Sequence, residues 1–167
     1  MICRFYIKKL LLLIAVMFTA SCVNTHNNTA ATMNSAQLEH EIFTEINNIR
    51  KSIGAGKLTR AADLDRAASM HSTDMAKNNF FSHKGSNGSR ADTRAKQQKI
   101  TFQAYSENLA MNCHYPQPAR YAIQGWLKSK EHYDNLIDKQ YTETGISAVY
   151  AGDGCWYFTQ VFCKRIK

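Results

Sequence analysis

The 167-residue chain lacks the marks of several common protein classes. Its main apolar run, Leu10 to Phe18, is too short to span a bilayer, which needs about 20 residues. It has no GxSxG or SxxK motif for a nucleophilic serine, no HExxH motif for zinc and no CxxC pair. Lysine and arginine (21) outnumber the acids (13), but they are scattered, so no nucleic-acid partner is predicted.

The N-terminus has the pattern of a secretory signal peptide. Its first nine residues hold three basic residues and no acid, the apolar run follows, and small residues precede Cys22. Cysteine after Ala-Ser resembles the lipobox of bacterial lipoproteins, where the thiol takes a diacylglycerol, although Thr19 replaces the usual leucine. The sequence therefore predicts a signal peptide over residues 1–21 and lipidation at Cys22, with ordinary cleavage after a small residue as the alternative.

Removal of residues 1–21 leaves 146 residues (167 − 21), the size of one domain. The signal carries three basic residues, so the mature net charge is 18 − 13 = +5, typical of a modestly basic solvated surface. Residues 22–34 are polar and without hydrophobic period, which predicts a flexible tether after the lipidated cysteine. Residues 35–167 form the predicted domain. Its lipid anchor is expected to hold it in the bacterial cell envelope, at the outer membrane or in the periplasm.

The spacing of apolar residues changes along the domain from helical to strand-like. Helices are predicted at about 35–53, 59–78, 90–98, 118–127 and 130–137, with a further helical turn from Ser106 to Met111. Strands are predicted at 145–150 and 155–166, joined by a Gly-rich hairpin. The second strand is nearly continuous in apolar and aromatic residues, so both of its faces should be covered. Helices followed by a buried hairpin predict an α+β layered domain.

Three cysteines remain after Cys22, and in an oxidising compartment they predict one disulfide and one free thiol. If Cys155 and Cys163 lie on one strand, they are about 26 Å apart and cannot bond to each other. Cys113 is therefore expected to bond with Cys155 or with Cys163, and the sequence does not choose between them.

His83, Glu107 and His132 are the residues best suited to chemistry. Two imidazoles and a carboxylate can hold a catalytic zinc ion if one coordination position stays open, or can act as general base and acid. Their separations of 24 and 25 residues form no local motif, so separate surface histidines are the alternative. His71 lies on the apolar face of its helix, which favours a hydrogen-bonded core histidine.

Six short blocks follow one another over roughly residues 38–163. They are His71-Ser-Thr-Asp-Met-Ala, Phe81-Ser-His83, Ser106-Glu107-Asn108-Leu-Ala110, Trp126-Leu-Lys-Ser129-Lys-Glu-His132-Tyr-Asp-Asn135-Leu, Thr144-Gly145-Ile146 and Tyr157-Phe-Thr159-Gln160-Val-Phe. In this order they resemble the bacterial CAP domain, of the superfamily named for cysteine-rich secretory proteins, antigen 5 and group-one pathogenesis-related proteins. The resemblance implies an α–β–α sandwich with a central, mostly antiparallel sheet and a shallow cleft.

The resemblance also assigns residues to the cleft. It is lined in similar proteins by a histidine and a glutamate that correspond to His83 and Glu107, and bacterial members add the histidine that corresponds to His132. Tyr157 stands where animal and plant members carry a second zinc-binding histidine, so a zinc ion (Zn2+) would need His83 and His132 instead. The resemblance further suggests Ser129 and Asn135, with Tyr157, as ligand-binding residues.

One departure concerns the backbone beside the glutamate. Ser106 replaces the usual glycine, and it would alter the local backbone if the position needed a positive φ, which only glycine adopts freely.

Three functions are compatible with these residues. Binding of a lipid, glycan or protein from the envelope or the extracellular space is preferred, because the family is linked mainly to binding and signalling and implies no general reaction. A zinc-assisted hydrolase would use His83 and His132 as ligands and Glu107 as base for a bound water. A structural envelope lipoprotein with a vestigial cleft is the third.

Overall fold

The computed structural model describes residues 34–166. The predicted signal peptide, Cys22 and all of the predicted tether but Asn34 lie outside the described residues. The elements are α1 (Ser35–Ser52), β1 (Thr59–Arg60), α2 (Ala62–Asn78), α3 (Ala91–Gln97), β2 (Phe102–Cys113), α4 (Pro118–Lys128), α5 (Lys130–Ile137), β3 (Glu143–Tyr150) and β4 (Cys155–Arg165). Within residues 34–166, no helix has the length and apolar character needed to cross a membrane.

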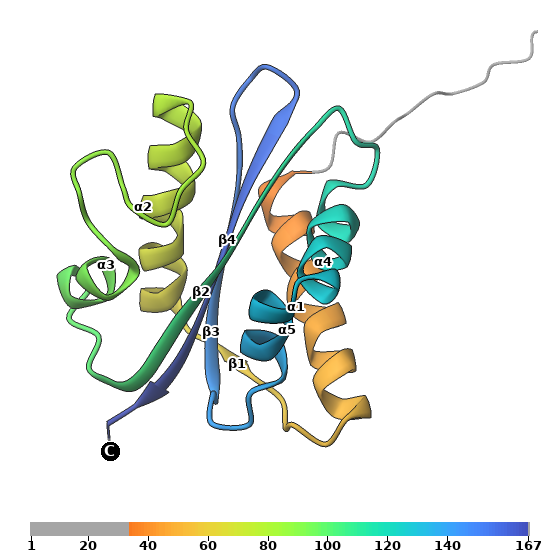
Figure 1. The fold of residues 1–167 in the computed structure, drawn as a ribbon, viewed down its shortest axis with the longest axis vertical. Coiled ribbons are helices and arrows are strands. Elements are labelled where there is room, and N and C mark those ends of the chain that lie inside the picture. The colour runs from red at the N-terminus through yellow and green to blue at the C-terminus, as the bar shows by residue number, and fades with distance from the viewer. Residues whose placement is uncertain (1–33, 167) are drawn as a thin grey trace, which may run out of the picture. The chain divides into compact units, whose positions relative to one another are not determined.

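The strands form one sheet in the order β1-β3-β4-β2. β1 pairs with β3 in parallel, and the β3–β4 and β4–β2 pairs are antiparallel. Helices α2 and α3 cover one face of the sheet, and α1, α4 and α5 cover the other (Figure 1). The predicted α–β–α sandwich with a mostly antiparallel sheet is therefore confirmed.

Strand β4 lies inside the sheet and is covered on both faces, as its apolar sequence predicts. Phe158 and Phe162 pack on the side of α1, α4 and α5, in the same core cluster as Trp126. Val161 and Cys163 alternate with them and pack on the other side, in a second cluster with the residues of α2. Side chains that alternate along one strand thus build the cores of both layers.

Helix α1 is fixed at both ends by polar groups. Asn34 and Gln37 form a reciprocal capping box at its start. Near its end the fully buried guanidinium of Arg50 donates to five backbone carbonyls, those of Ala55, Gly56, Leu136, Asp138 and Tyr141. Arg50 therefore ties the C-terminal end of α1 to the chain that leaves α5.

Helix α2 begins at Ala62 and not at Thr59 as predicted. Thr59 and Arg60 pair instead with β3, because this pairing satisfies backbone N–H and C=O groups that the end of a helix would leave without partners. α2 then packs so tightly on β3 that a Cβ at Gly145 would lie 2.1 Å from the backbone carbon of Leu64. Only glycine fits at this crossing, which explains the residue in the Thr-Gly-Ile block.

The helical turn predicted from Ser106 to Met111 is wrong, because these residues lie within strand β2. β2 pairs with β4 along almost its whole length, and this tertiary pairing overrides a local sequence of good helix formers.

The pairing of β2 with β4 also shows which cysteines form the disulfide. Cys113 lies opposite Cys155 in the register and is bonded to it, while Cys163 is a free, fully buried thiol. Cys155 and Cys163 lie on one strand, as the distance argument required. Burial raises the pKa of the Cys163 thiol to about 11, so it is unreactive in the folded protein.

Candidate functional site

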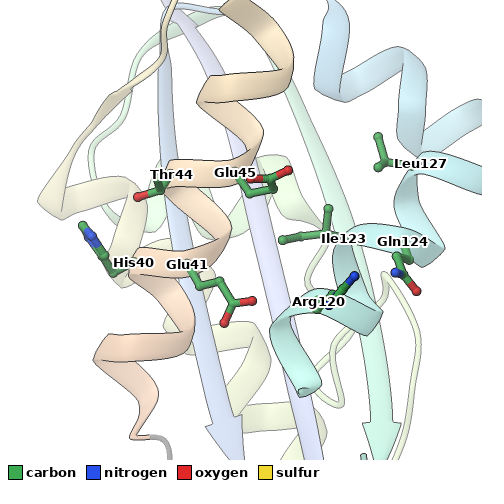
Figure 2. A pocket seen from close by; sticks show the side chains of 8 residues that line it. All are labelled: His40, Glu41, Thr44, Glu45, Arg120, Ile123, Gln124 and Leu127. Carbon is green, nitrogen blue, oxygen red and sulfur yellow. The ribbon is translucent and has the colours of Figure 1, made fainter. Parts of the chain in front are cut away.

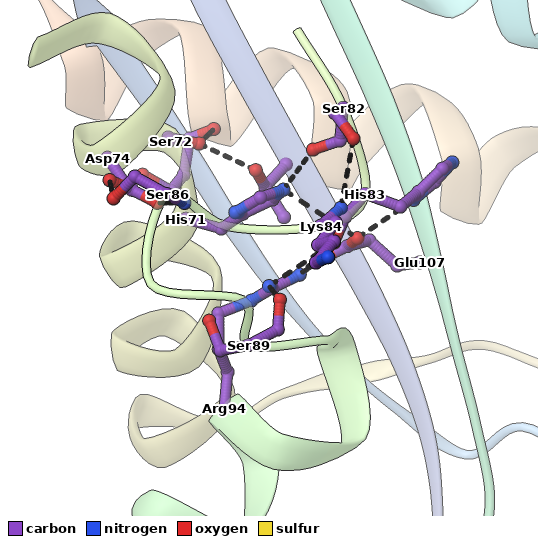
Figure 3. A network of polar contacts seen from close by, with 12 residues as sticks. His71, Ser72, Asp74, Ser82, His83, Lys84, Ser86, Ser89, Arg94 and Glu107 are labelled. Carbon is purple, nitrogen blue, oxygen red and sulfur yellow. Dashed lines mark hydrogen bonds and ion pairs between the residues drawn. The ribbon is translucent and has the colours of Figure 1, made fainter. Parts of the chain in front are cut away.

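Strand β2 places Glu107 at the centre of a buried polar network (Figure 3). Its carboxylate is held from two sides: Oε1 lies 2.9 Å from Nδ1 of His83, and Oε2 lies 2.6 Å from a guanidinium nitrogen of Arg94. The Glu107 and Arg94 side chains are both 3% exposed. Burial alone would raise the pKa of Glu107, but the hydrogen bond from His83 and the charge of Arg94 together hold it below its ordinary value. Glu107 is therefore a carboxylate at neutral pH.

This arrangement fixes the orientation and tautomer of His83. A carboxylate only accepts hydrogen bonds, so Nδ1 of His83 must donate, and the other ring nitrogen, Nε2, is free to accept when the ring is neutral. The His83 side chain is 57% exposed, and Nε2 has no hydrogen-bond partner among residues 34–166. The site thus presents an oriented imidazole nitrogen to the solvent.

His71 lies behind this pair and is fully buried, as predicted. Its Nε2 is 2.8 Å from the carbonyl oxygen of Ser82, so it donates there and fixes the start of the segment that carries His83. Burial lowers the pKa of His71, and its Nδ1 has no partner in the described part of the chain, both of which fit a neutral ring. His71 is a positioning residue for the loop.

Asn108 follows Glu107 in the strand and therefore points to the opposite face of the sheet. The buried Asn108 amide donates to the carbonyl oxygen of His132 at 3.0 Å, and its Oδ1 accepts from Asn135 at 2.9 Å. Asn135, predicted as a ligand-binding residue, thus holds α5 on the sheet. Glu107 and Asn108, which follow one another in β2, thus bind α3 on one face of the sheet and α5 on the other.

Helix α5 brings His132 close to His83. Burial lowers the pKa of His132 below its ordinary value, and a proton on His83 would lower it further, so His132 is neutral at pH 7. His132 and Ser129 both line one groove of about 400 Å³ along the end of β2. The structure therefore places His83 in contact with Glu107 and close to His132, beside the edge strand β2.

Tyr157 does not line this groove. It is 2% exposed, and its ring packs with Met75 and Leu109 on the α2 side of the sheet. Its hydroxyl lies 3.4 Å from Oδ1 of Asn79, at the end of α2. The expectation that Tyr157 contacts a ligand is corrected: it packs beneath the site.

Ser106 does not strain the backbone as its replacement of glycine suggested. It lies in the extended strand β2 and is not among the described residues with positive φ. Its neighbour Glu107 therefore keeps regular strand geometry.

The predicted use of His83 and His132 as zinc ligands stays a prediction. Among residues 34–166, no group of three or more histidine, cysteine or acidic side chains is placed to hold a metal ion. Both oxygens of Glu107 are engaged, one by His83 and one by Arg94. In the structure Glu107 therefore orients His83 and pairs with Arg94, and its use as a base for a bound water stays a prediction.

A second groove, of about 560 Å³, lies between α1 and α4 (Figure 2). Its walls carry charged and polar side chains, among them Glu41 and Glu45 of α1 and Arg120 of α4. It contains none of the predicted site residues.

Two residues of the site were not predicted from the sequence. Arg94 lies in a short helix of mostly polar residues, and no local pattern marks its burial against Glu107. Asn108 adjoins Glu107 in one of the six blocks, so its position in the sequence could have identified it as a residue of the site.

The sequence of this three-layer domain identifies it as a CAP domain. The model of the cysteine-rich secretory protein family matches residues 43–162. The chain belongs to this family.

Three bacterial proteins illustrate the similarity. The chain is 35% identical over 127 residues to the membrane protein YlbC of Bacillus subtilis (strain 168), a match that covers 76% of this chain and 34% of YlbC. It is 30% identical to an extracellular protein of Bacillus anthracis that contains an SCP domain, with a TM-score of 0.69 and coverage of 78% and 41%. An outer surface protein of Borrelia burgdorferi shares the fold at 20% identity, with a TM-score of 0.73 and coverage of 80% and 97%. The chain thus spans only 34% of the length of YlbC and 41% of the length of the B. anthracis protein.

Proposed function

We propose that this protein is an envelope-tethered CAP domain that binds a ligand in the cleft formed by His83, Glu107 and His132. One observation carries the proposal: a 57% exposed imidazole is held at Nδ1 by a buried, ion-paired carboxylate. A surface histidine without such a partner rotates freely and loses entropy when a ligand fixes it. Here the orientation is set before a ligand arrives.

The geometry also indicates the kind of group that the cleft recognises. Nε2 of neutral His83 accepts a hydrogen bond, so the matching group is a hydroxyl or an amide N–H. The neutral His132 nearby adds a second ring that accepts or donates. These features support recognition of an uncharged polar group.

The proposed location rests on the signal peptide and lipidation site predicted at the N-terminus. Lipidation at Cys22 would leave a tether over residues 22–34, which reaches about 40 Å when fully extended. The names of the B. anthracis and B. burgdorferi proteins place those proteins outside the cytoplasm, which supports an envelope location. The cleft would then meet ligands close to the membrane that holds it.

A purely structural role gives a different expectation. If the cleft is vestigial, replacing His83, Glu107 and His132 together should leave cells without the defect that deletion of the protein produces. The binding proposal requires the triple variant to reproduce the deletion.

The test is capture from solubilised envelope extract by the immobilised protein. Wild-type protein should retain a ligand that the His83→Ala variant does not retain. His40→Ala is the matched control, because His40 is an exposed histidine on α1, away from the cleft, and its loss should change nothing. Equal capture by wild type and His83→Ala would overturn the proposal.

A further inference from the structure

The groove that ends at His132 extends well beyond the histidine and has a distinct lining. Its floor is the end of strand β2, from Leu109 to Asn112. Phe81, from the loop that carries His83, contributes to its lining, and α4 supplies side chains from Tyr121 to Trp126. The groove therefore shares His132 with the proposed site and extends from it along β2 and α4.

Exposed aromatic rings mark this surface. Phe81 is 49% exposed, Tyr115 48% and Tyr121 42%, although most aromatic side chains of the described domain are buried or partly buried. The rings of Tyr115 and Tyr121 lie 4.0 Å apart between centroids. Clustered exposed aromatic residues in a groove indicate a binding surface, and flat ring faces suit the C–H faces of sugar rings.

A buried acceptor in the groove lacks a donor. Asn112 is 9% exposed and its Nδ2 donates to the carbonyl oxygen of Pro118 at 3.0 Å. Its Oδ1 accepts no hydrogen bond from residues 34–166. A buried polar atom without a partner costs about 1–3 kcal/mol. Solvent does not reach this oxygen in the structure, so a ligand N–H or O–H can relieve the cost only when the Asn112 side chain turns toward the groove.

The lining also carries no formal charge at neutral pH. None of the residues around the groove is a lysine, an arginine or an acid, and His132 is neutral. Such a surface gives no electrostatic gain to a phosphate or carboxylate. Its mixture of aromatic rings with amide, hydroxyl and imidazole groups matches a neutral polar ligand better than an acyl chain, which would leave these groups unpaired.

We propose that the groove binds a neutral oligosaccharide of N-acetylhexosamine units, as found in the glycan strands of the bacterial wall. The sugar rings stack on Tyr115 and Tyr121, and the Asn112 side chain turns toward the groove so that its Oδ1 accepts from an acetamido N–H. Ser129 and His132 supply polar contacts at the other end. This inference rests on the proposed binding function, since the groove shares His132 with the proposed site.

The test uses the exported protein with Cys22→Ser, which removes the lipid site, labelled with nitrogen-15. Titration with the tetramer of N-acetylglucosamine should give saturable NMR shifts that include the side-chain amide of Asn112. Tyr121→Ala should weaken binding about tenfold, through loss of one stacking face. Tyr150→Ala is the matched control, because Tyr150 is a 50% exposed tyrosine that does not line the groove, and its loss should leave the affinity unchanged.

The glucose tetramer, which has the same rings without acetamido groups, should bind at least tenfold more weakly. Purified cell walls should sediment the wild type but not Tyr121→Ala. Equal affinity for the two tetramers, shifts outside the groove, or no shift up to the solubility of the sugar would each overturn the inference. If the sugar fails while capture from envelope extract still depends on His83, the glycan assignment is wrong and the proposed function stands.

Discussion

Replacement of Arg94 by methionine removes the charge opposite Glu107 but keeps a long side chain on α3. Both side chains of the pair are 3% exposed, with nitrogen and oxygen 2.6 Å apart. Breaking a buried ion pair by removing one partner costs about 3–5 kcal/mol, because the remaining charge stays buried. His83 still donates to Glu107 at 2.9 Å, which favours the lower end of that range, about 3 kcal/mol.

Urea denaturation of wild type and Arg94→Met measures this loss as a difference in the free energy of unfolding. In a thermal melt the same change lowers the midpoint by roughly 10 °C for a domain of this size. Lys96→Met is the matched control on the same helix, since Lys96 pairs with Asp92 at the exposed surface, and its midpoint should not change measurably. A loss of less than about 1 kcal/mol in Arg94→Met would refute the reasoning that Arg94 neutralises a buried Glu107.

Further predictions concern pH, the disulfide and the helix crossing. The pKa of Glu107 is lower in the folded state than in the unfolded state, where it is about 4.3. The stabilisation by the Glu107 carboxylate is therefore complete above the unfolded pKa and is lost as pH falls through the folded pKa. The difference in unfolding free energy between wild type and Glu107→Gln should shrink in acid, and a constant difference would contradict this. The Cys113–Cys155 disulfide closes a loop of 42 residues. Replacing both cysteines with serine should lower the free energy of unfolding by up to about 4 kcal/mol, measured by denaturant titration. An unchanged unfolding midpoint would refute this prediction. Gly145→Ala should lower the melting temperature by several degrees, because its Cβ meets the backbone of α2. Gly125→Ala, at an exposed position of α4 with open space around it, should raise the melting temperature slightly; equal melts would contradict the crossing.

Regular apolar patterns made most of the fold predictable. Helix α1 shows its period in Leu38, Ile42 and Ile46, all of which are buried as expected. The apolar run of β4 correctly indicated a strand covered on both faces. Strand β2 was missed because it lies at the edge of the sheet and carries polar residues, such as Glu107 and Asn108, whose partners are distant in sequence.

The candidate site was predictable only in part. Its histidines and glutamate were recognised from short blocks, but nothing local marks the ion pair of Arg94 with Glu107, which forms between α3 and β2. Burial of Tyr157 is likewise a consequence of sheet register, which the sequence does not give directly. Residues that act through partners on other elements need the tertiary structure.

The central claim is that Glu107 fixes His83 so that its Nε2 faces the ligand. Long-range proton–nitrogen NMR at pH 9 reports directly which ring nitrogen carries the proton. We predict that Nδ1 of His83 is protonated and Nε2 is not, and that the Nε2 signal moves when the captured envelope ligand is added. A protonated Nε2 with a bare Nδ1, or a free mixture of both tautomers, would contradict the account.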